Sequence, residues 1–253
     1  MKNIVFVHGM FQNPKSWIEW IKYFEAKGYN CIAPAYPNHD GEPTELRKNI
    51  PSALSSLTLD VVVDSITREI SKLDEKPVVI GHSMGGLITQ ILTNRDLVKA
   101  GICVDSAPPA GVISFKWSFL KSNLPVVNPF KGKAPCVMSK EHFHYAFCNV
   151  MTKEESDKAY DEFVTPESRN IPRSVMKYGK IDFKKPHPPL LMIAGSDDNI
   201  IPQSLVETNF RKYSDKSSKT ELKVFPGRSH FICGQKGWEE VAEDIATWIG
   251  SLA

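Results

Sequence analysis

The chain has 253 residues, of which 42% are hydrophobic and 24% charged, and its formal net charge is +2. This size and composition fit one large globular domain, or a core with an inserted subdomain, better than two independent domains. Because the charge is nearly balanced and no Lys/Arg run is flanked by aromatic residues, neither nucleic acid nor an anionic membrane surface is suggested as a partner.

The five cysteines are scattered along the chain, and none of them forms a CxxC pair. An odd number without such spacing favours free thiols in a reducing compartment over a disulfide framework. The apolar run in the amino-terminal stretch MKNIVFVHG is too short for the core of a signal peptide, and no apolar segment is long enough to span a membrane. We therefore expect a cytoplasmic protein without membrane insertion. No sequence signal sets its oligomeric state.

Short apolar runs alternate with segments of helical periodicity along most of the chain. Strands are expected at residues 4–7, 30–33, 78–80, 99–104, 190–194 and 221–225. Helices are expected at residues 15–26, 60–73, 84–94, 205–213 and 238–252. This alternation predicts the α/β class, with a mostly parallel sheet covered by helices on both faces. In such a sheet, ligands bind beyond the carboxyl ends of the strands.

Two segments interrupt the alternation. Residues 37–59 form a polar, proline-containing excursion, and residues 107–187 separate two expected strands by a length too great for a structureless loop. We interpret residues 107–187 as an inserted helical cap on a core formed by residues 1–106 and 188–253. Any single aromatic residue of the cap can be explained by packing of the cap against the core. The aromatic residues together, however, predict that some of them line an apolar pocket. The candidates for substrate contact are Phe11, Trp117, Phe143 and Tyr145.

The stretch PVVIGHSMGGLIT, residues 77–89, contains the pattern G-x-S-x-G between an expected strand and an expected helix. A sharp turn there lifts the Ser83 hydroxyl clear of the sheet, and the flanking glycines leave room for neighbouring backbone. The alternative is a glycine-rich turn with an incidental serine. Because the strand-turn-helix context is also present, we interpret Ser83 as a nucleophile.

A serine nucleophile needs a base, and the chain has seven histidines. His230 follows the last expected strand in FPGRSHF and is the favoured base. His82 is expected to point away from the Ser83 hydroxyl and to have a structural role. His142 and His144 lie in the cap, where they could contact substrate.

The imidazole of such a base is oriented by a carboxylate. Asp198, in GSDDNIIP after the expected strand 190–194, is the favoured acid, with Asp105 and Asp197 as alternatives. The amide of Met84 would donate to an oxyanion, and Gly9 permits a bend that directs the Met10 amide to the same place. No HExxH or similar cluster of metal ligands appears, so we expect no metal and no other cofactor.

The order Ser83, Asp198, His230 resembles the α/β-hydrolase superfamily. The matching pieces are FVHGM, GYNCIAPAYP, VVIGHSMGG, LLMIAGSDDNIIP and FPGRSHF, and they are most similar to the HG-x group of small cytosolic esterases, lactonases and haloperoxidase-like enzymes. The chain departs from the superfamily in starting at the HG strand, without an opening antiparallel hairpin, and in having AYPNHDGEP after the second strand.

The resemblance implies a serine hydrolase acting on a small-molecule carboxylic ester or lactone with an apolar acyl group, including an acyl-homoserine lactone. Hydroxynitrile lyases keep the same triad, and perhydrolysis can accompany esterase activity, so both stand as alternatives. A catalytically inactive ligand-binding protein of the same fold is the non-enzymatic alternative.

Overall fold

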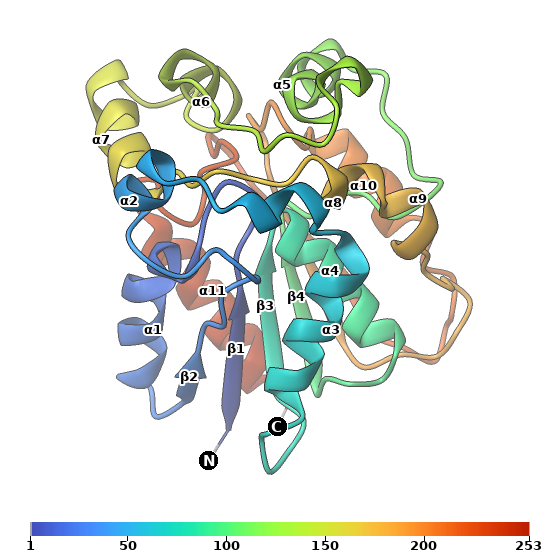
Figure 1. Ribbon diagram of the computed structural model, residues 1–253. Coiled ribbons are helices and arrows are strands. Elements are labelled where there is room, and N and C mark those ends of the chain that lie inside the picture. The colour runs from blue at the N-terminus through green and yellow to red at the C-terminus, as the bar shows by residue number, and fades with distance from the viewer. Residues whose placement is uncertain (1, 253) are drawn as a thin grey trace.

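The computed structural model describes residues 2–252, which form a six-stranded, all-parallel sheet in the order β2-β1-β3-β4-β5-β6 (Figure 1). The strands are β1 (Asn3–Val7), β2 (Asn30–Ile32), β3 (Val78–His82), β4 (Ala100–Val104), β5 (Leu190–Gly195) and β6 (Thr220–Phe225). All six expected strands are confirmed, with ends that differ by at most two residues. Parallel register places every carboxyl end at the same edge of the sheet.

Alternate residues of the strands pack on opposite faces of the sheet. Ile4 and Phe6 belong to the apolar cluster beneath α1 and α11, whereas Val5 and Val7 face the cluster formed with α3, α4 and α10. Each face is therefore sealed by helices, as the uninterrupted apolar strands require. The helices are α1 (Ile18–Glu25), preceded by the 3₁₀ helix η1 (Pro14–Trp17), α3 (Leu59–Ile70), α4 (Met84–Asn94), α10 (Gln203–Phe210) and α11 (Trp238–Gly250).

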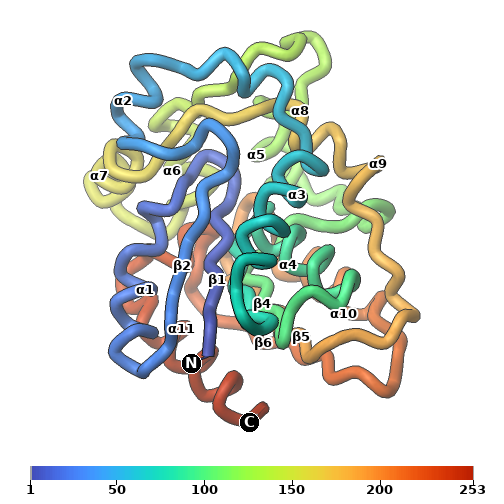
Figure 2. The backbone as a smooth tube through the Cα atoms, turned by 60° about the horizontal axis from the view of Figure 1, so that its bottom comes forward, coloured from blue at the N-terminus to red at the C-terminus, as the bar shows by residue number. Residues whose placement is uncertain are grey.

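A further layer of helices lies over the carboxyl ends of the strands, at the top of Figure 1. Residues 107–187 contribute α5 (Trp117–Val127), η3 (Pro129–Lys131), α6 (Lys140–Ala146), α7 (Lys153–Phe163), α8 (Asn170–Arg173) and α9 (Val175–Tyr178). Figure 2 shows the chain ends near each other at the opposite end of the sheet. Within residues 2–252, no helix is long and apolar enough to span a membrane.

The segment 37–59 is more ordered than its polar composition suggested. It forms α2 (Pro43–Lys48) and the 3₁₀ helix η2 (Ser52–Ser56), and Pro43 takes the first helical position, where its missing N–H costs nothing. The Arg47 guanidinium donates to the carbonyls of Tyr160, Asp161 and Val164 at the end of α7. This segment therefore joins the cap layer rather than forming a separate loop.

Helix α4 approaches β1 so closely that no side chain fits between them. A Cβ atom on Gly85 would lie 2.1 Å from the Val7 carbonyl oxygen and 2.6 Å from that of His8. A Cβ on Gly81, in β3, would lie 2.1 Å from the Gly85 carbonyl oxygen. Because the obstructing atoms are backbone, they cannot move aside without shifting the strand or the helix.

We predict that Gly85→Ala destabilises the protein by about 3 kcal/mol or more, because the new methyl group forces β1 and α4 apart. Gly250→Ala is the matched control, since a Cβ there would meet no atom within 4 Å. Urea unfolding of both variants measures the difference. Equal midpoints for Gly85→Ala and the unsubstituted protein would contradict this account of the packing.

Candidate active site

Ser83 lies at the junction of β3 and α4 in a conformation that residues with a Cβ rarely adopt. Its φ is 55° and its ψ is −117°. Its N–H donates to the Val104 carbonyl at 2.9 Å, and its own carbonyl accepts from Ala107 N–H at 2.9 Å. These bonds to the end of β4 hold the strained turn in place. The side chain is 8% exposed and reaches the cavity described below.

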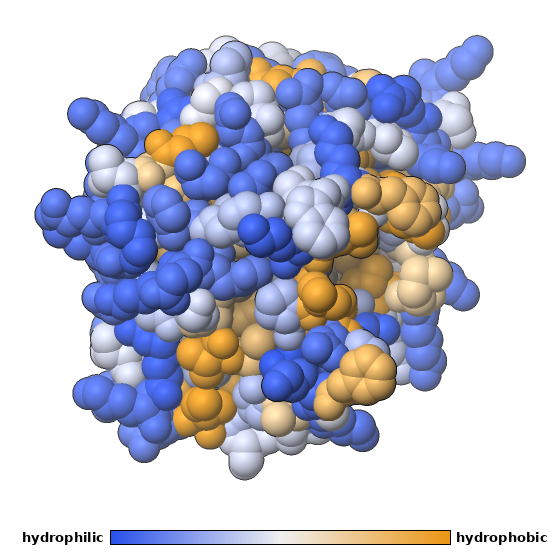
Figure 3. Space-filling model, turned by 90° about the horizontal axis from the view of Figure 1, so that it is seen from above, coloured by the Kyte–Doolittle hydropathy of each residue, from blue (hydrophilic) through white to orange (hydrophobic). Residues whose placement is uncertain are grey.

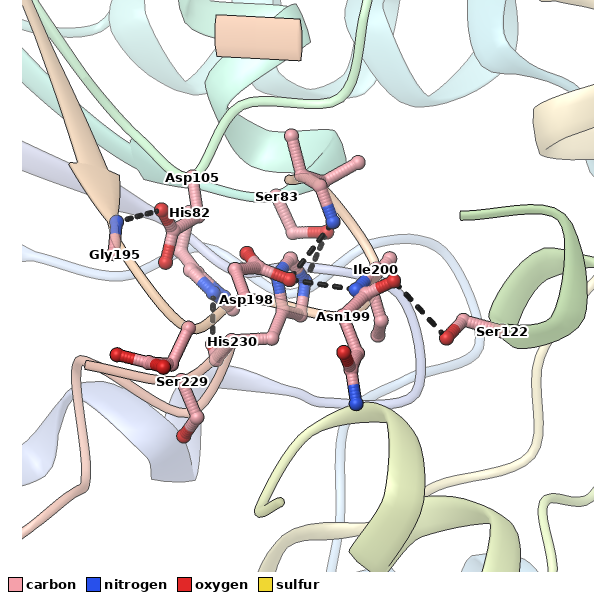
Figure 4. Close-up of polar contacts among 12 residues, drawn as sticks. His82, Ser83, Asp105, Ser122, Gly195, Asp198, Asn199, Ile200, Ser229 and His230 are labelled. Atoms are coloured by element: carbon pink, nitrogen blue, oxygen red, sulfur yellow. Dashed lines mark hydrogen bonds and ion pairs between the residues drawn. The ribbon is translucent and has the colours of Figure 1, made fainter. Parts of the chain in front are cut away.

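A chain of two hydrogen bonds runs from Ser83 to a buried carboxylate (Figure 4). The Ser83 Oγ lies 2.9 Å from His230 Nε2, and His230 Nδ1 lies 2.5 Å from Asp198 Oδ2. His230 is fully buried, and this burial lowers the pKa of its imidazole to about 3. At neutral pH the ring is therefore uncharged, with Nε2 free to take a proton from the serine.

Of the three acids considered from the sequence, Asp198 is the one that contacts His230. Its other oxygen, Oδ1, accepts from the backbone N–H groups of Ile200 and Ile201 at 2.7 and 2.8 Å. Those two donors favour the charged form and counteract the burial that raises the pKa of this carboxyl. Asp197 is exposed, and its carboxylate accepts instead from the neighbouring Ser196 hydroxyl at 2.6 Å.

Asp105 places a second buried carboxyl beside Asp198. Its Oδ1 accepts from Gly195 N–H at 2.7 Å, while Oδ2 has no partner among the described residues. Burial, together with the negative charge of Asp198, raises the pKa of Asp105 well above its usual range. Two adjacent buried carboxylates do not both ionise readily, and the two backbone donors to Asp198 Oδ1, against one to Asp105, favour the charge on Asp198.

His82 has the structural role expected from its position beside Ser83. Its Nε2 lies 2.8 Å from the His230 backbone oxygen, and its Nδ1 lies 3.3 Å from Gln12 Oε1. Within residues 2–252, the donor atoms of His82, Asp105 and His230 lie within 4.8 Å of one another, a spacing that a metal could use. Since both nitrogens of His82 and of His230 are already engaged in polar contacts, we assign no metal to this cluster.

The loop after β1 packs directly against Ser83. A Cβ on Gly9 would lie 2.9 Å from the Ser83 Cβ, so only glycine allows this approach. Met10 follows, and Met84 is the first residue of α4, where backbone N–H groups have no partner within the helix. Both methionines line the same cavity as Ser83. The two residues expected to supply oxyanion donors are thus brought together at the serine.

A buried glutamate from the cap, which the sequence did not reveal, holds this loop. Glu167 Oε2 accepts from Phe11 N–H at 3.2 Å and lies 3.2 Å from His39 Nε2, and all three side chains are nearly or fully buried. Phe11 has a φ of 61°, and its carbonyl accepts from Thr165 N–H at 3.0 Å. Glu167 is 156 residues from Phe11 and 128 from His39, so no local pattern could have indicated the contact.

An apolar cavity of about 470 Å³ opens above Ser83. Core residues form its floor and cap residues its walls, and both Phe11 and Trp117 line it as expected. Further apolar contributions come from Ala107, Phe119, Leu124, Val126, Met138, Phe147, Val175, Ile200 and Ile201. The few polar groups around it make this a site for an apolar ligand that presents one polar centre to the serine.

Phe143 and Tyr145 do not line this cavity. Phe143 is fully buried and packs against Phe147, Tyr160 and Phe231, with ring centroids 4.9 to 6.0 Å apart. The Tyr145 ring instead lies beneath Lys121, whose ammonium is 3.8 Å from the ring centroid.

Phe147, one helical turn beyond Phe143, lines the cavity and meets the His230 ring edge-on at 4.9 Å. The sequence did not single it out, because all the aromatics of EHFHYAF share the same pattern. The cap histidines also lie outside the lining: His142 Nε2 is 2.9 Å from the Ser122 carbonyl oxygen.

The fold agrees with the comparison to known families. The sequence profile of the Alpha/beta hydrolase family matches residues 4–244, nearly the whole chain. The chain belongs to the alpha/beta hydrolase family. Among curated relatives of this family member, the non-heme chloroperoxidase CPO-A1 of Kitasatospora aureofaciens is 24% identical over 94% of this chain and 88% of the relative.

Solved structures of other proteins have the same fold as this chain. The methylesterase MES16 from Arabidopsis superposes with a TM-score of 0.73 at 14% identity, covering 99% of each chain. The monoacylglycerol lipase of Paleococcus ferrophilus gives a TM-score of 0.71 at 18% identity, covering 99% of this chain and 95% of its own. At such identities these similarities establish the shared fold.

We predict that Glu167→Gln changes both the charge state of His39 and the stability of the protein. Burial lowers the pKa of His39, but the charge and hydrogen bond of Glu167 outweigh it and raise that pKa above 6.5. Without the carboxylate, burial is opposed only by the hydrogen bond to the Pro37 carbonyl and the charge of Asp40, so the pKa of His39 should fall, which NMR of the imidazole would measure.

A raised pKa in the folded state adds stability below the unfolded value of 6.5, and this stability is lost as the pH rises through the folded pKa. We therefore expect Glu167→Gln to cost about 3 kcal/mol at about pH 6 and less at about pH 9, as measured by urea unfolding. Glu162→Gln, at an exposed position in α7, should change stability at neither pH. An equal loss at both pH values would refute the charge pairing.

Proposed function

We propose that this protein is a serine hydrolase that cleaves a carboxylic ester or lactone with an apolar acyl group through an acyl-enzyme. The observation that carries the proposal is the buried hydrogen-bond chain from Ser83 to His230 to Asp198. A serine hydroxyl is a weak nucleophile by itself, and this arrangement supplies both its base and the carboxylate that orients the base.

In the acylation step, Ser83 Oγ attacks the ester carbonyl carbon while its proton passes to His230 Nε2. The imidazolium that forms is stabilised by Asp198 across the 2.5 Å contact at Nδ1. The carbonyl oxygen becomes negatively charged, and the amides of Met10 and Met84 are the proposed donors to it. His230 then returns the proton to the departing alkoxide, and the C–O bond of the ester breaks.

Deacylation repeats the sequence with water. His230 removes a proton from the water molecule as its oxygen attacks the acyl carbon, and then protonates Ser83 Oγ as the acid leaves. The second carboxyl, Asp105, is buried on the side of the site that faces Gly195, and its raised pKa favours the neutral form. In that form it adds no second negative charge that would compete with Asp198 for the imidazolium.

The cavity supports an apolar acyl group. Its volume of about 470 Å³ accommodates a medium-length hydrocarbon chain, and side chains such as Phe11, Phe119 and Val126 offer it no hydrogen bond. The proposal includes lactones, acyl-homoserine lactones among them, and membership of the HG-x group of small esterases. The five cysteines are all unpaired, which supports a reducing, cytoplasmic setting.

We predict that Ser83→Ala lowers the hydrolysis of a p-nitrophenyl ester by about ten-thousand-fold or more while leaving the fold intact, because the nucleophile is lost. A fluorophosphonate probe should label Ser83 in the unsubstituted protein, as mapped by mass spectrometry. Ser71→Ala, at an exposed position, serves as the control and should keep full activity. A folded protein that is not labelled, or is labelled at another serine, would overturn the mechanism.

We predict that kcat/KM rises about two- to fourfold with each CH₂ added to the acyl chain until the cavity is filled, because each buried methylene favours binding. Linear esters and acyl-homoserine lactones of matched acyl length should both be hydrolysed, as followed by release of acid. Lactone rates no higher than those of Ser83→Ala would limit the activity to open-chain esters.

A further inference from the structure

Helix α5 presents an apolar face at the mouth of the cavity. Trp117, Leu120, Leu124 and Val127 recur at helical spacing and therefore lie on one side of the helix. All four line the cavity, yet they remain between 37% and 74% exposed. They thus form the boundary between the interior of the cavity and the outer surface of the cap.

Neighbouring residues extend this surface outward. Phe115 is 85% and Phe130 is 95% exposed, and Met176, next to a cavity residue of α9, is 65% exposed. Figure 3 looks down on this end of the molecule and shows hydrophobic side chains gathered around a hollow. Single exposed apolar residues are ordinary, but a cluster of this extent marks a contact surface. We call this set the apolar rim: Ile113, Phe115, Trp117, Leu120, Leu124, Val127, Phe130 and Met176.

The two chain segments that carry the apolar rim have charged side chains of one sign only. Residues 106–140 and 168–181 contain no aspartate or glutamate, although the chain has 29 of them. Within the described residues, none of the exposed lysines there has a carboxylate within 4.0 Å, whereas Lys15, Lys48 and Lys72 on other surfaces are paired. We call these the rim lysines: Lys116, Lys121, Lys131, Lys133, Lys177 and Lys180.

We propose that the apolar rim and the rim lysines dock this protein onto an anionic lipid surface, with the mouth of the cavity facing the lipid. Exposed tryptophan and phenylalanine side chains insert at the boundary between headgroups and acyl chains, and lysines are attracted to anionic headgroups. A second copy of the chain fits this face less well. A two-fold contact would bring the unpaired lysines of both copies together, without carboxylates to compensate them.

This inference runs against the expectation, drawn from the sequence, that an anionic membrane surface is not a partner. The net charge of +2 averages over the whole chain, while the acid-free segments lie together on one end of the folded protein. Docking requires no membrane-spanning helix. If the proposed hydrolase activity is correct, an apolar ester would also pass from the lipid into the cavity without crossing water.

Flotation with lipid vesicles tests the docking directly and needs no turnover. The purified protein is mixed with vesicles of phosphatidylcholine alone, or of phosphatidylcholine with phosphatidylglycerol, at about 0.1 M salt, where surface charges act over about 10 Å. We expect it to float with the anionic vesicles and to remain unbound with the neutral ones. Raising the salt to about 1 M should weaken the binding, because the screening length then falls to about 3 Å.

Two double variants separate the electrostatic and apolar contributions. Lys131→Glu with Lys133→Glu should lower vesicle partitioning about 25-fold or more, since each lysine near the surface contributes about fivefold. Phe115→Ser with Phe130→Ser should lower it about tenfold. Neither pair lines the cavity, so thermal unfolding and, under the proposed function, hydrolysis of a soluble ester should stay unchanged.

Matched controls carry the same changes on other surfaces. Lys212→Glu with Lys216→Glu alters the net charge equally, in the connection that leads into the amino end of β6, and should still float. Ile18→Ser with Val61→Ser removes exposed apolar side chains outside the cap and should also still float.

Three outcomes would overturn the proposal. The first is that the protein does not float with anionic vesicles. The second is that it binds neutral and anionic vesicles equally and the lysine-to-glutamate variant binds as well as the unsubstituted protein. The third is that sedimentation without lipid shows a dimer, and that Phe115→Ser with Phe130→Ser dissociates it. The last would identify the apolar rim as a self-association surface.

Discussion

The structure depends on a close contact between the backbones of β1, β3 and α4 at Ser83. Three segments meet there without side chains between them, because Gly9, Gly81 and Gly85 leave no Cβ atoms at the crossing. This contact fixes the distance between β1, β3 and α4 and holds the serine in a conformation that an unconstrained chain would abandon. The hydrogen bond from Ser83 to His230 depends on this contact, because it sets where the Ser83 side chain lies.

The cap forms hydrogen bonds with two loops of the core, the loop after β1 and the loop that carries Asp198. Glu167 and Thr165 bind the loop after β1, and so link the cap to the residues next to Met10. On the other side, α5 reaches the loop that carries Asp198, since the Ser122 hydroxyl donates to the Asn199 carbonyl at 3.2 Å. A displacement of the cap would therefore shift both the loop that carries Met10 and the loop that carries Asp198.

The outer surface of the same cap differs chemically from its underside. Its inner residues are mostly apolar and enclose the cavity, whereas its outer edge combines exposed aromatic residues with lysines that lack carboxylate partners among the described residues. The net charge of the whole chain does not reveal this, because the acidic residues that balance these lysines lie in other segments of the chain, α7 among them. Placement in three dimensions, rather than total charge, decides what kind of surface the protein presents.

The sequence by itself determined the alternation of strands and helices and the turn at Ser83, and it predicted that His230 and an acid, with Asp198 favoured, lie near that serine. Parallel strands bring their carboxyl ends to one edge, so residues that follow different strands must converge. The tertiary structure alone decided which acid contacts His230, why Phe147 and not Phe143 reaches the cavity, and that Glu167 holds the loop at Phe11. These depend on side-chain direction and on contacts between segments far apart in the chain, which periodicity and local motifs do not encode.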